Sequence, residues 1–297
     1  MNDDTTNNTD PVERLFGIDL ESTTQNTETE AEPQETTKEH VMKLSCHIDN
    51  NNNPINSMGE GLDISLVGEL EKYSQVLERN AVFKKSSKVS KLPSYLCVQF
   101  VRFYWKKESN VGGTKAGKAK ILRSVMFPKV FDIYNNCTDE LKKSLDLGRE
   151  FEQKIRAEED NAKLEGKRKE AEKYDKEMKG QDDETAEERE KKKLVGDALK
   201  KEQKLEENKR HDLALYRTHG TGLDTGNYEL VAVVTHKGRS ADGGHYMAWI
   251  HHGGDDWLCF DDDIVTHVKI DEILALKGGG DWHTAYLCIY RKLEASK

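Results

Sequence analysis

The chain has 297 residues, of which 35% are hydrophobic and 34% are charged, so a large part of its length cannot belong to a packed core. Its net charge is -9, and residues 1–37 account for all of it with ten Asp or Glu and one Arg. The balanced remainder lacks the basic patch of a nucleic-acid-binding protein. No apolar run reaches the roughly 18 residues that span a bilayer, and the N-terminus has no signal-peptide character, so we expect no membrane partner.

Cysteine usage limits both the compartment and the metal chemistry. The five cysteines are widely separated and form no CxxC pair: Cys46, Cys97, Cys137, Cys259 and Cys288. A paired-thiolate zinc site is therefore not expected, and we predict no metal and no cofactor. An odd number of scattered thiols suits a reducing compartment, so we expect a cytoplasmic or nuclear protein.

The first third of the chain changes character near residue 38. Residues 1–37 are rich in Asn, Thr, Asp and Glu, which predicts a largely disordered acidic segment, apart from a short apolar patch at 12–20. Residues 41–48 alternate apolar and polar side chains, as a half-buried strand does. Residues 61–73 follow an Asn-rich turn, and we predict a helix there.

The next segment is the richest in β-branched and aromatic residues. Residues 92–105 predict a central strand. The basic, Gly-containing residues 106–118 predict a mobile loop, and residues 124–133 predict another strand that includes Pro128.

A long charged segment interrupts this pattern. Of residues 149–210, 39 are charged, with 19 Lys or Arg against 20 Asp or Glu. Glu and Lys often lie three or four apart, which supports a solvated helix, but no a/d repeat indicates a coiled coil. We predict a helical or flexible insertion at 149–211, either without activity or serving as an arm that binds a partner.

Short strands return in the last 70 residues. We predict strands at 228–235, 246–251, 256–260 and 284–290, and a helix at 268–277 that ends at three consecutive glycines. The folded core is therefore expected to comprise residues 38–148 and 212–293, divided by the insertion.

The candidate chemistry lies on two consecutive predicted strands. His245 follows Gly243 and Gly244, and Asp261 follows the next aromatic strand. A His needs a group on its second nitrogen to orient it as a general base, and Asp261 supplies one if the two strands are neighbours. Asp262 and Asp263 are alternative orienting acids or turn residues. From composition alone, a His followed by an Asp tract is more often structural, so both interpretations stay open.

These motifs resemble those of a known family. The runs around His245 and Asp261 resemble the histidine box of the ubiquitin-specific proteases, cysteine peptidases that remove ubiquitin. Leu92-Pro-Ser-Tyr-Leu with Val101-Arg-Phe103, and Val125-Met-Phe-Pro128, resemble two strands of that family. The segment Gly278–Tyr286 resembles its proteasome-associated branch. The motifs occur in the family's order, and the resemblance covers residues 12–148 and 212–292.

The resemblance implies an α+β, papain-like fold, of which this chain holds the palm and fingers portion, an antiparallel β-sheet with flanking helices. His245 matches the catalytic histidine, Asp261 its orienting acid and Asp262 a neighbouring acid that assists. The loop of Gly238–Gly243 matches one that covers the channel for ubiquitin's C-terminal Gly-Gly tail, and residues 106–118 lie where a second such loop occurs. We expect substrate contacts from this region: Gly238, Ser240, Gly243, Gly244 and Tyr246.

The sequence also departs from the family. The N-terminal thumb with its Gly-Asn-Thr-Cys-like box has no match, so we expect the nucleophile to be missing and this chain to be inactive alone. Cys137 precedes a predicted helix start, which can lower a thiol pKa, but its acidic neighbours oppose thiolate formation.

The implied function is that of the C-terminal part of a deubiquitinase, which cleaves isopeptide bonds after ubiquitin's terminal Gly. Its implied partners are ubiquitin, ubiquitinated proteins and the proteasome regulatory particle. Two alternatives remain: a non-catalytic ubiquitin-binding adaptor, and a scaffold that binds a partner through the charged insertion.

Overall fold

The computed structural model describes residues 10–50, 53–106, 117–178, 223–240, 243–280 and 282–294. The chain divides into two compact units, one of residues 1–145 and 226–293 and the other of residues 146–225 and 294–297. The first unit combines antiparallel sheets with a few helices, which agrees with the predicted α+β class.

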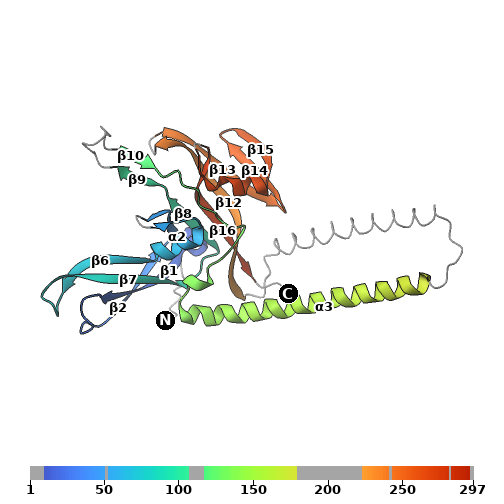
Figure 1. The fold of residues 1–297 in the computed structure, drawn as a ribbon, viewed down its shortest axis with the longest axis horizontal. Helices are drawn as coiled ribbons and strands as arrows, with labels where there is room; N and C mark the ends of the chain where they lie inside the picture. The colour runs from blue at the N-terminus through green and yellow to red at the C-terminus, as the bar shows by residue number, and fades with distance from the viewer. Residues whose placement is uncertain are drawn as a thin grey trace, which may run out of the picture. The chain divides into compact units, whose positions relative to one another are not determined.

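A large sheet forms the centre of the first unit (Figure 1). Every second side chain of its strand β8 is buried, namely Leu96, Val98 and Phe100, as expected from the apolar and aromatic composition of that strand. The pairs flanking β14 are antiparallel, and β3 pairs parallel with β8. In spatial order the sheet contains β15 (Ile264–Lys269), β14 (Asp256–Asp261), β13 (Gly243–Gly253), β12 (Asp224–Ser240), β16 (Thr284–Glu294), β8 (Tyr95–Val101) and β3 (Leu44–His47), with β11 (Val130–Asp132) beside β12.

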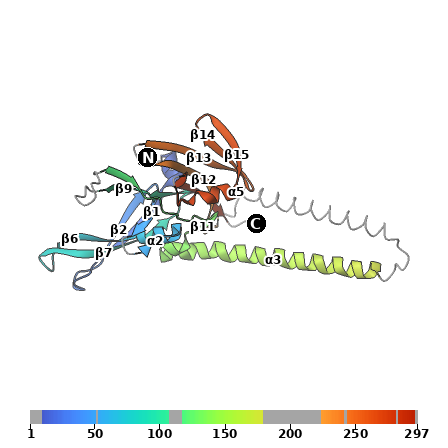
Figure 2. The same ribbon diagram turned by 45° about the horizontal axis from the view of Figure 1, so that its top comes forward.

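A second sheet of four strands projects from the large sheet in Figures 1 and 2. Its order is β2 (Glu35–Val41), β1 (Ile18–Asn26), β7 (Arg79–Lys91) and β6 (Val67–Ser74). Helix α1 (Pro11–Phe16) and the start of β1 coincide with the apolar patch at 12–20, which the prediction of disorder excepted. The predicted disorder is wrong for residues 21–26 and 35–37, which form the rest of β1 and the start of β2. Ile18 and Leu20 are buried in the core. Burial of these two side chains stabilises β1, although most of the strand is polar. Residues 1–9 lie outside the described residues.

The helix predicted at 61–73 is correct only in its first part. Helix α2 spans Met58–Ser65, with the Ser57 side chain accepting a hydrogen bond from the Glu60 backbone N–H at its start. Gly61 lies so close to β3 that an added Cβ would be 2.3 Å from the His47 carbonyl oxygen. From Val67 the chain instead forms β6, because pairing with β7 satisfies its backbone groups.

The strand predicted at 92–105 is interrupted by a buried arginine. Arg102 separates β8 from β9 (Phe103–Lys106), which pairs with β10 (Gly117–Lys120). The middle of the predicted loop, 107–116, lies outside the described residues. Of the strand predicted at 124–133, only β11 forms. The remaining short elements nearby are β4 (Asp49–Asn50), β5 (Asn53–Pro54) and a 3₁₀ turn, η1 (Tyr134–Asn136).

The predicted C-terminal helix is confirmed as α5 (Ile270–Leu274) followed by a 3₁₀ turn, η2 (Ala275–Lys277). Its first two predicted residues instead end β15. The Glu272 side chain accepts a hydrogen bond from the Lys269 backbone N–H at its start, and Gly278 ends it with a φ of 99°, which favours glycine. Ile273 and Leu276 are buried in the core, which fixes this helix in the first unit.

The charged segment is helical as far as it is described. Helix α3 spans Asp139–Met178; its Leu145 is buried in the first unit, and the second unit begins at residue 146. Glu152 and Arg156, four residues apart, form an exposed ion pair of the kind that supports a solvated helix. The rest of the predicted insertion, up to residue 211, lies outside the described residues. None of the described helices is long and apolar enough to cross a membrane.

The ends of the four-stranded sheet depend on two carboxylates. Glu28 pairs with Arg79 at 2.6 Å and accepts the Val82 N–H at 3.2 Å, and Glu32 accepts a hydrogen bond from Ser74 at 2.6 Å. The Arg79 hydrogen bond holds the pKa of Glu28 below its ordinary value of 4.5, and the Ser74 hydrogen bond lowers the pKa of Glu32 in the same way.

We therefore expect the tips of this sheet to loosen in acid. A carboxylate with a lowered folded-state pKa stabilises the fold above its ordinary pKa of 4.5, and this contribution is lost as the pH falls below that value. Hydrogen exchange of the Val82 amide, corrected for its intrinsic pH dependence, should lose protection below about pH 4. Glu28→Gln should remove that loss; an unchanged profile in the variant would contradict the assignment.

Candidate active site

His245 lies at the start of β13, where two glycines shape the backbone. Gly238 and Gly244 have φ values of 132° and 137°, a region that side chains other than glycine rarely adopt. A Cβ on Gly244 would lie 2.3 Å from the Lys237 carbonyl oxygen. Lys237 and His245 are register partners across β12 and β13. The glycine pattern read from the sequence thus has a geometric cause, because the hairpin closes tightly beside His245.

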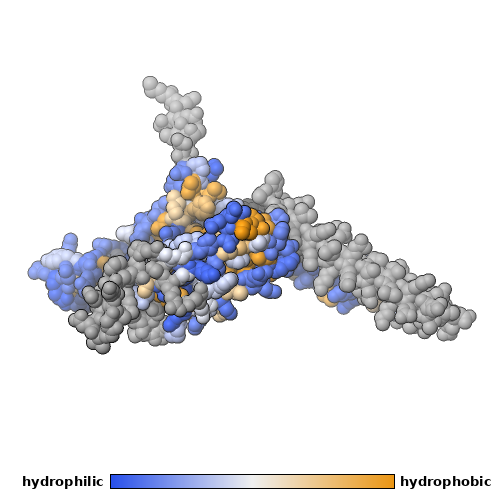
Figure 3. All heavy atoms as spheres, turned by 90° about the horizontal axis from the view of Figure 1, so that it is seen from above, coloured by the Kyte–Doolittle hydropathy of each residue, from blue (hydrophilic) through white to orange (hydrophobic). Residues whose placement is uncertain are grey.

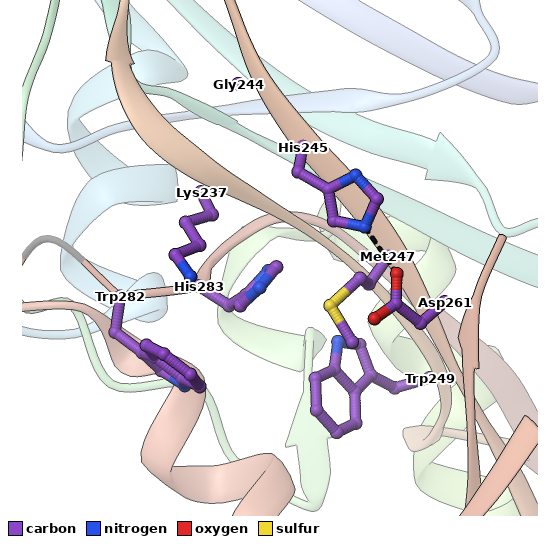
Figure 4. A pocket seen from close by; sticks show the side chains of 8 residues that line it. All are labelled: Lys237, Gly244, His245, Met247, Trp249, Asp261, Trp282 and His283. Atoms are coloured by element: carbon purple, nitrogen blue, oxygen red, sulfur yellow. Dashed lines mark hydrogen bonds and ion pairs between the residues drawn. The ribbon is translucent and has the colours of Figure 1, made fainter. Parts of the chain in front are cut away.

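Asp261 reaches His245 from the neighbouring strand. Because β13 pairs with β14, with Ala248 opposite Phe260, the end of β14 lies beside the start of β13. The imidazole Nε2 of His245 and the Oδ1 of Asp261 are hydrogen-bonded (Figure 4). Both side chains are partly open to solvent, with exposed fractions of 39% and 44%. The predicted juxtaposition of His245 and Asp261 is therefore confirmed.

Asp262 completes a small polar cluster. It has a φ of 51° in the turn that connects β14 to β15, a conformation that Asp tolerates better than most residues. Potential ligand atoms of His245, Asp261 and Asp262 all lie within 4.8 Å of one another. Such a group has the composition of a divalent cation site, but the hydrogen bond that already joins His245 to Asp261 equally suits an acid–base pair.

A pocket of about 540 Å³ opens beside His245. In Figure 4 the His245–Asp261 pair forms one side, and Trp282 and Lys237 lie across from it. Met247 and Trp249 project from β13 toward the same side as His245, because side chains alternate along a strand. The lining comprises Lys237, Gly244, His245, Met247, Trp249, Asp261, Trp282 and His283.

A buried polar network supports this pocket. The Trp249 indole N–H donates to Thr235 Oγ1 at 3.0 Å, and Thr235 Oγ1 lies 3.3 Å from His283 Nδ1. The His283 ring packs edge-on against His245, with ring centres 6.1 Å apart. Burial, followed by the nearby Lys237 cation, lowers the pKa of His283 below its ordinary value of 6.5. A neutral His283 therefore places no second positive charge next to the His245–Asp261 pair.

Trp282 and Lys237 form the opposite wall. The Trp282 side chain is 66% exposed, and the Lys237 ammonium lies 4.5 Å from the centre of its ring. An exposed tryptophan in cation–π contact with a lysine is a binding surface that is both apolar and positively charged.

The predicted substrate residues lie on both sides of the sheet. Gly244 lines the pocket, and an added side chain at Gly243 would meet open space. Gly238 contributes to the tight hairpin, whereas Tyr246 projects from the face of β13 opposite His245 and packs against His236, with ring centres 4.7 Å apart. Ser240 is the last residue of β12, and its side chain lies outside the described part, as do residues 241–242.

Sequence reasoning missed much of the pocket wall. The alternation that places Met247 and Trp249 on the His245 side was readable from the strand pattern. Trp282 and His283 had no such signal, because only the pairing order of the large sheet brings the start of β16 close to β12 and β13.

None of the five thiols lines this pocket. Cys46, Cys137, Cys259 and Cys288 are buried, and Cys97 is partly buried. Burial raises the pKa of Cys46 to about 12 and also raises the pKa values of Cys97, Cys259 and Cys288. Cys137 donates a hydrogen bond to the Ile133 carbonyl oxygen at 3.4 Å from a fully buried position. These environments favour inert thiols over reactive thiolates.

Comparison with known proteins gives a family for the chain. The family model described as ubiquitin carboxyl-terminal hydrolase matches residues 1–290. Ubiquitin carboxyl-terminal hydrolase 6 of Arabidopsis thaliana is 41% identical over 283 residues, which cover 95% of this chain and 53% of that protein.

Two more distant relatives match in the same way. Ubiquitin carboxyl-terminal hydrolase 14 of Caenorhabditis elegans is 33% identical, covering 94% of this chain and 50% of the relative. Ubiquitin carboxyl-terminal hydrolase 6 of Schizosaccharomyces pombe is 35% identical, covering 84% and 48%. The chain thus spans about half the length of these relatives. From the motifs, the fold and these matches together, the chain belongs to the ubiquitin carboxyl-terminal hydrolase family.

Proposed function

We propose that this chain supplies the acid–base half of a thiol-dependent deubiquitinase that hydrolyses isopeptide bonds after ubiquitin's C-terminal Gly. The hydrogen bond between His245 and Asp261, at the edge of an open pocket, is the observation that carries the proposal. Asp261 holds the imidazole in one tautomer and stabilises the imidazolium that forms during the reaction.

The hydrogen-bonding pattern assigns the two ring nitrogens different tasks. Nε2 of His245 is engaged by Asp261, so Nδ1 exchanges protons with the reacting groups. Nδ1 accepts the thiol proton of a cysteine as its sulfur attacks the isopeptide carbonyl. It then gives that proton to the lysine amine as the C–N bond breaks, leaving a thioester. Water then attacks the thioester carbonyl, and one of its protons passes through Nδ1 to the departing thiolate. Ubiquitin leaves as a carboxylic acid, which releases the second proton to solvent and becomes a carboxylate.

The tight hairpin beside His245 suits the acyl part of the substrate. An added side chain at Gly243 would meet open space, so its absence lets another backbone come close to the hairpin that Gly238 and Gly244 close. A tail that ends in Gly-Gly has no side chains of its own and can pass close to such a surface. We assign the channel for this tail to the hairpin, with Gly243 and Gly244 nearest the scissile bond.

The nucleophile comes from a part of the enzyme outside this sequence. Burial and the raised pKa of Cys46, Cys259 and Cys288 do not favour an internal substitute. The face of β13–β15 opposite His245 carries Ile250 and Val265, which are 43% and 52% exposed, and this indicates a neighbour on that face in addition to the contact that brings the nucleophile to His245. Figure 3, which views the molecule from above, shows hydrophobic patches at the surface. Such a face favours cover by another folded segment.

We further propose that the enzyme acts at the proteasome, in the cytoplasm or nucleus, on ubiquitinated proteins bound to the regulatory particle. The resemblance of Gly278–Tyr286 to the proteasome-associated branch supports this location. The names of the relatives are consistent with ubiquitin as the partner and add nothing on the proteasome.

A non-catalytic ubiquitin-binding adaptor is the second candidate. Burial of four of the five thiols favours it, because this chain alone then offers no accessible nucleophile apart from the partly buried Cys97. Such an adaptor would still bind ubiquitin through the same surfaces.

Labelling of native cell lysate separates these candidates. A ubiquitin probe with a C-terminal thiol-reactive electrophile is added, and an antibody to residues 38–60 detects the product. A labelled band well above the mass of this 33.9 kDa chain plus ubiquitin is expected for the enzyme. Endogenous protein of the mass of this chain that never reacts would overturn the enzymatic proposal in favour of the adaptor.

A further inference from the structure

The wall of Trp282 and Lys237 has no task in the proton transfers described above. It lies in the same pocket as His245 and Asp261 and combines an exposed indole with an exposed ammonium group. The pocket is also larger than the acyl side of the substrate requires. A Gly-Gly tail has no side chain to fill a pocket of about 540 Å³, whereas the polypeptide that carries the modified lysine has several.

The charge distribution across the pocket indicates how that polypeptide lies. One end carries the Asp261 carboxylate beside His245, with Asp262 close to both outside the lining, and the other end carries Lys237. His283, the remaining titratable group of the lining, is buried between them next to the Lys237 cation and adds a ring face. The leaving lysine amine belongs at the His245 end, so a residue next to that lysine meets Lys237 and Trp282.

We propose that Trp282 and Lys237 form the leaving-group subsite of this enzyme and select substrates with an acidic residue beside the ubiquitinated lysine. The apolar part of an Asp or Glu side chain packs on the indole, and its carboxylate pairs with the Lys237 ammonium. An opposite charge at this position favours the complex, and a like charge repels it. This inference rests on the proposed deubiquitinase function and adds a substrate preference to it.

The test uses two leaving groups on the same assembled enzyme. The 297-residue chain is co-expressed with the part of the Arabidopsis relative outside the match, which we expect to carry the cysteine box. Turnover is measured with ubiquitin–aminocoumarin, which has no flanking residues, and with ubiquitin linked to a lysine peptide flanked by Glu or by Arg. We expect kcat/KM for the Glu-flanked peptide to be about threefold higher than for the Arg-flanked one, a ratio typical of an exposed ion pair.

Variants of Trp282 and Lys237 test whether this wall causes the preference for the Glu-flanked peptide. Lys237→Glu should invert the preference, and Trp282→Ala should lower kcat/KM for both peptides by about tenfold relative to aminocoumarin, with partial recovery in Trp282→Phe. Lys269→Glu, which changes a 66% exposed lysine outside the pocket lining, is the matched control and should keep the preference.

The outcomes separate the two proposals. If the assembly cleaves aminocoumarin but does not distinguish the two peptides, the subsite is wrong and the deubiquitinase function stands. If Trp282→Ala prevents the two parts from co-purifying, Trp282 belongs to their interface and the subsite is also wrong. If the assembly forms and cleaves none of the substrates, both proposals are wrong.

Discussion

Replacing His245 with Ala is expected to lower kcat/KM of the assembled enzyme for ubiquitin–aminocoumarin by about 10³-fold, within the range for loss of a general acid–base group. The reason is that one imidazole serves both half-reactions, first toward the thiol and the leaving amine and then toward water. Asp261 is the described hydrogen-bond partner of His245. It orients the imidazole ring but cannot carry out the proton transfers in its place. The measurement is initial-rate hydrolysis, with the melting temperature recorded for each variant.

His267→Gln provides the matched control. His267 is an exposed residue of β15, two strands away from β13 in the same sheet, and does not line the pocket. Its replacement should leave the rate within about twofold, as expected for a surface change away from the chemistry. A His245→Ala enzyme that keeps more than a tenth of the activity, with an unchanged melting temperature, would show that another group acts as the base.

Replacing Arg102 with Leu is expected to lower the free energy of unfolding by about 3–5 kcal/mol, because several buried carbonyl oxygens lose their donor at about 1–3 kcal/mol each. Arg102 has no exposed surface, and burial lowers the pKa of its guanidinium to about 10. It donates hydrogen bonds to the carbonyl oxygens of Ala285 at 2.6 Å, Arg123 at 2.8 Å, Lys277 at 3.2 Å and Ile121 at 3.3 Å.

The cost arises because those carbonyl groups lose a donor that water cannot easily replace. They belong to the loop after β10, to η2 and to β16, so the substitution loosens the two elements between which Trp282 and His283 lie. Urea unfolding measures the effect. Arg79→Met is the control, since Arg79 is 57% exposed and its pair with Glu28 is screened by solvent, so its loss should change the unfolding free energy far less. Equal losses in the two variants would contradict the role assigned to the buried guanidinium.

The local sequence determined the elements in which the residue pattern along the chain matches the side chains that are buried in the fold. Alternation along β8, the glycines around His245 and the Gly278 stop after η2 were each readable, because each reflects a backbone preference acting over a few residues. The same applies to the charged helix α3, which needs no tertiary partner to explain its composition. His245 and Asp261 were also identifiable, since they flank two consecutive strands joined by a short turn.

Only the tertiary structure decided the features that depend on distant partners. The polar strand β1 folds because β2 and β7 pair with it and Ile18 enters the core, although composition predicts disorder for its residues beyond the apolar patch at 12–20. Residues 67–73 form a strand because their backbone groups pair with β7 in an antiparallel ladder, which a helix in this segment could not form. Trp282 reaches the pocket because β16 pairs beside β12 from the far end of the chain. Local preferences for helix or strand differ by only a few tenths of a kcal/mol per residue. In each of these cases, long-range strand pairing and burial outweigh them.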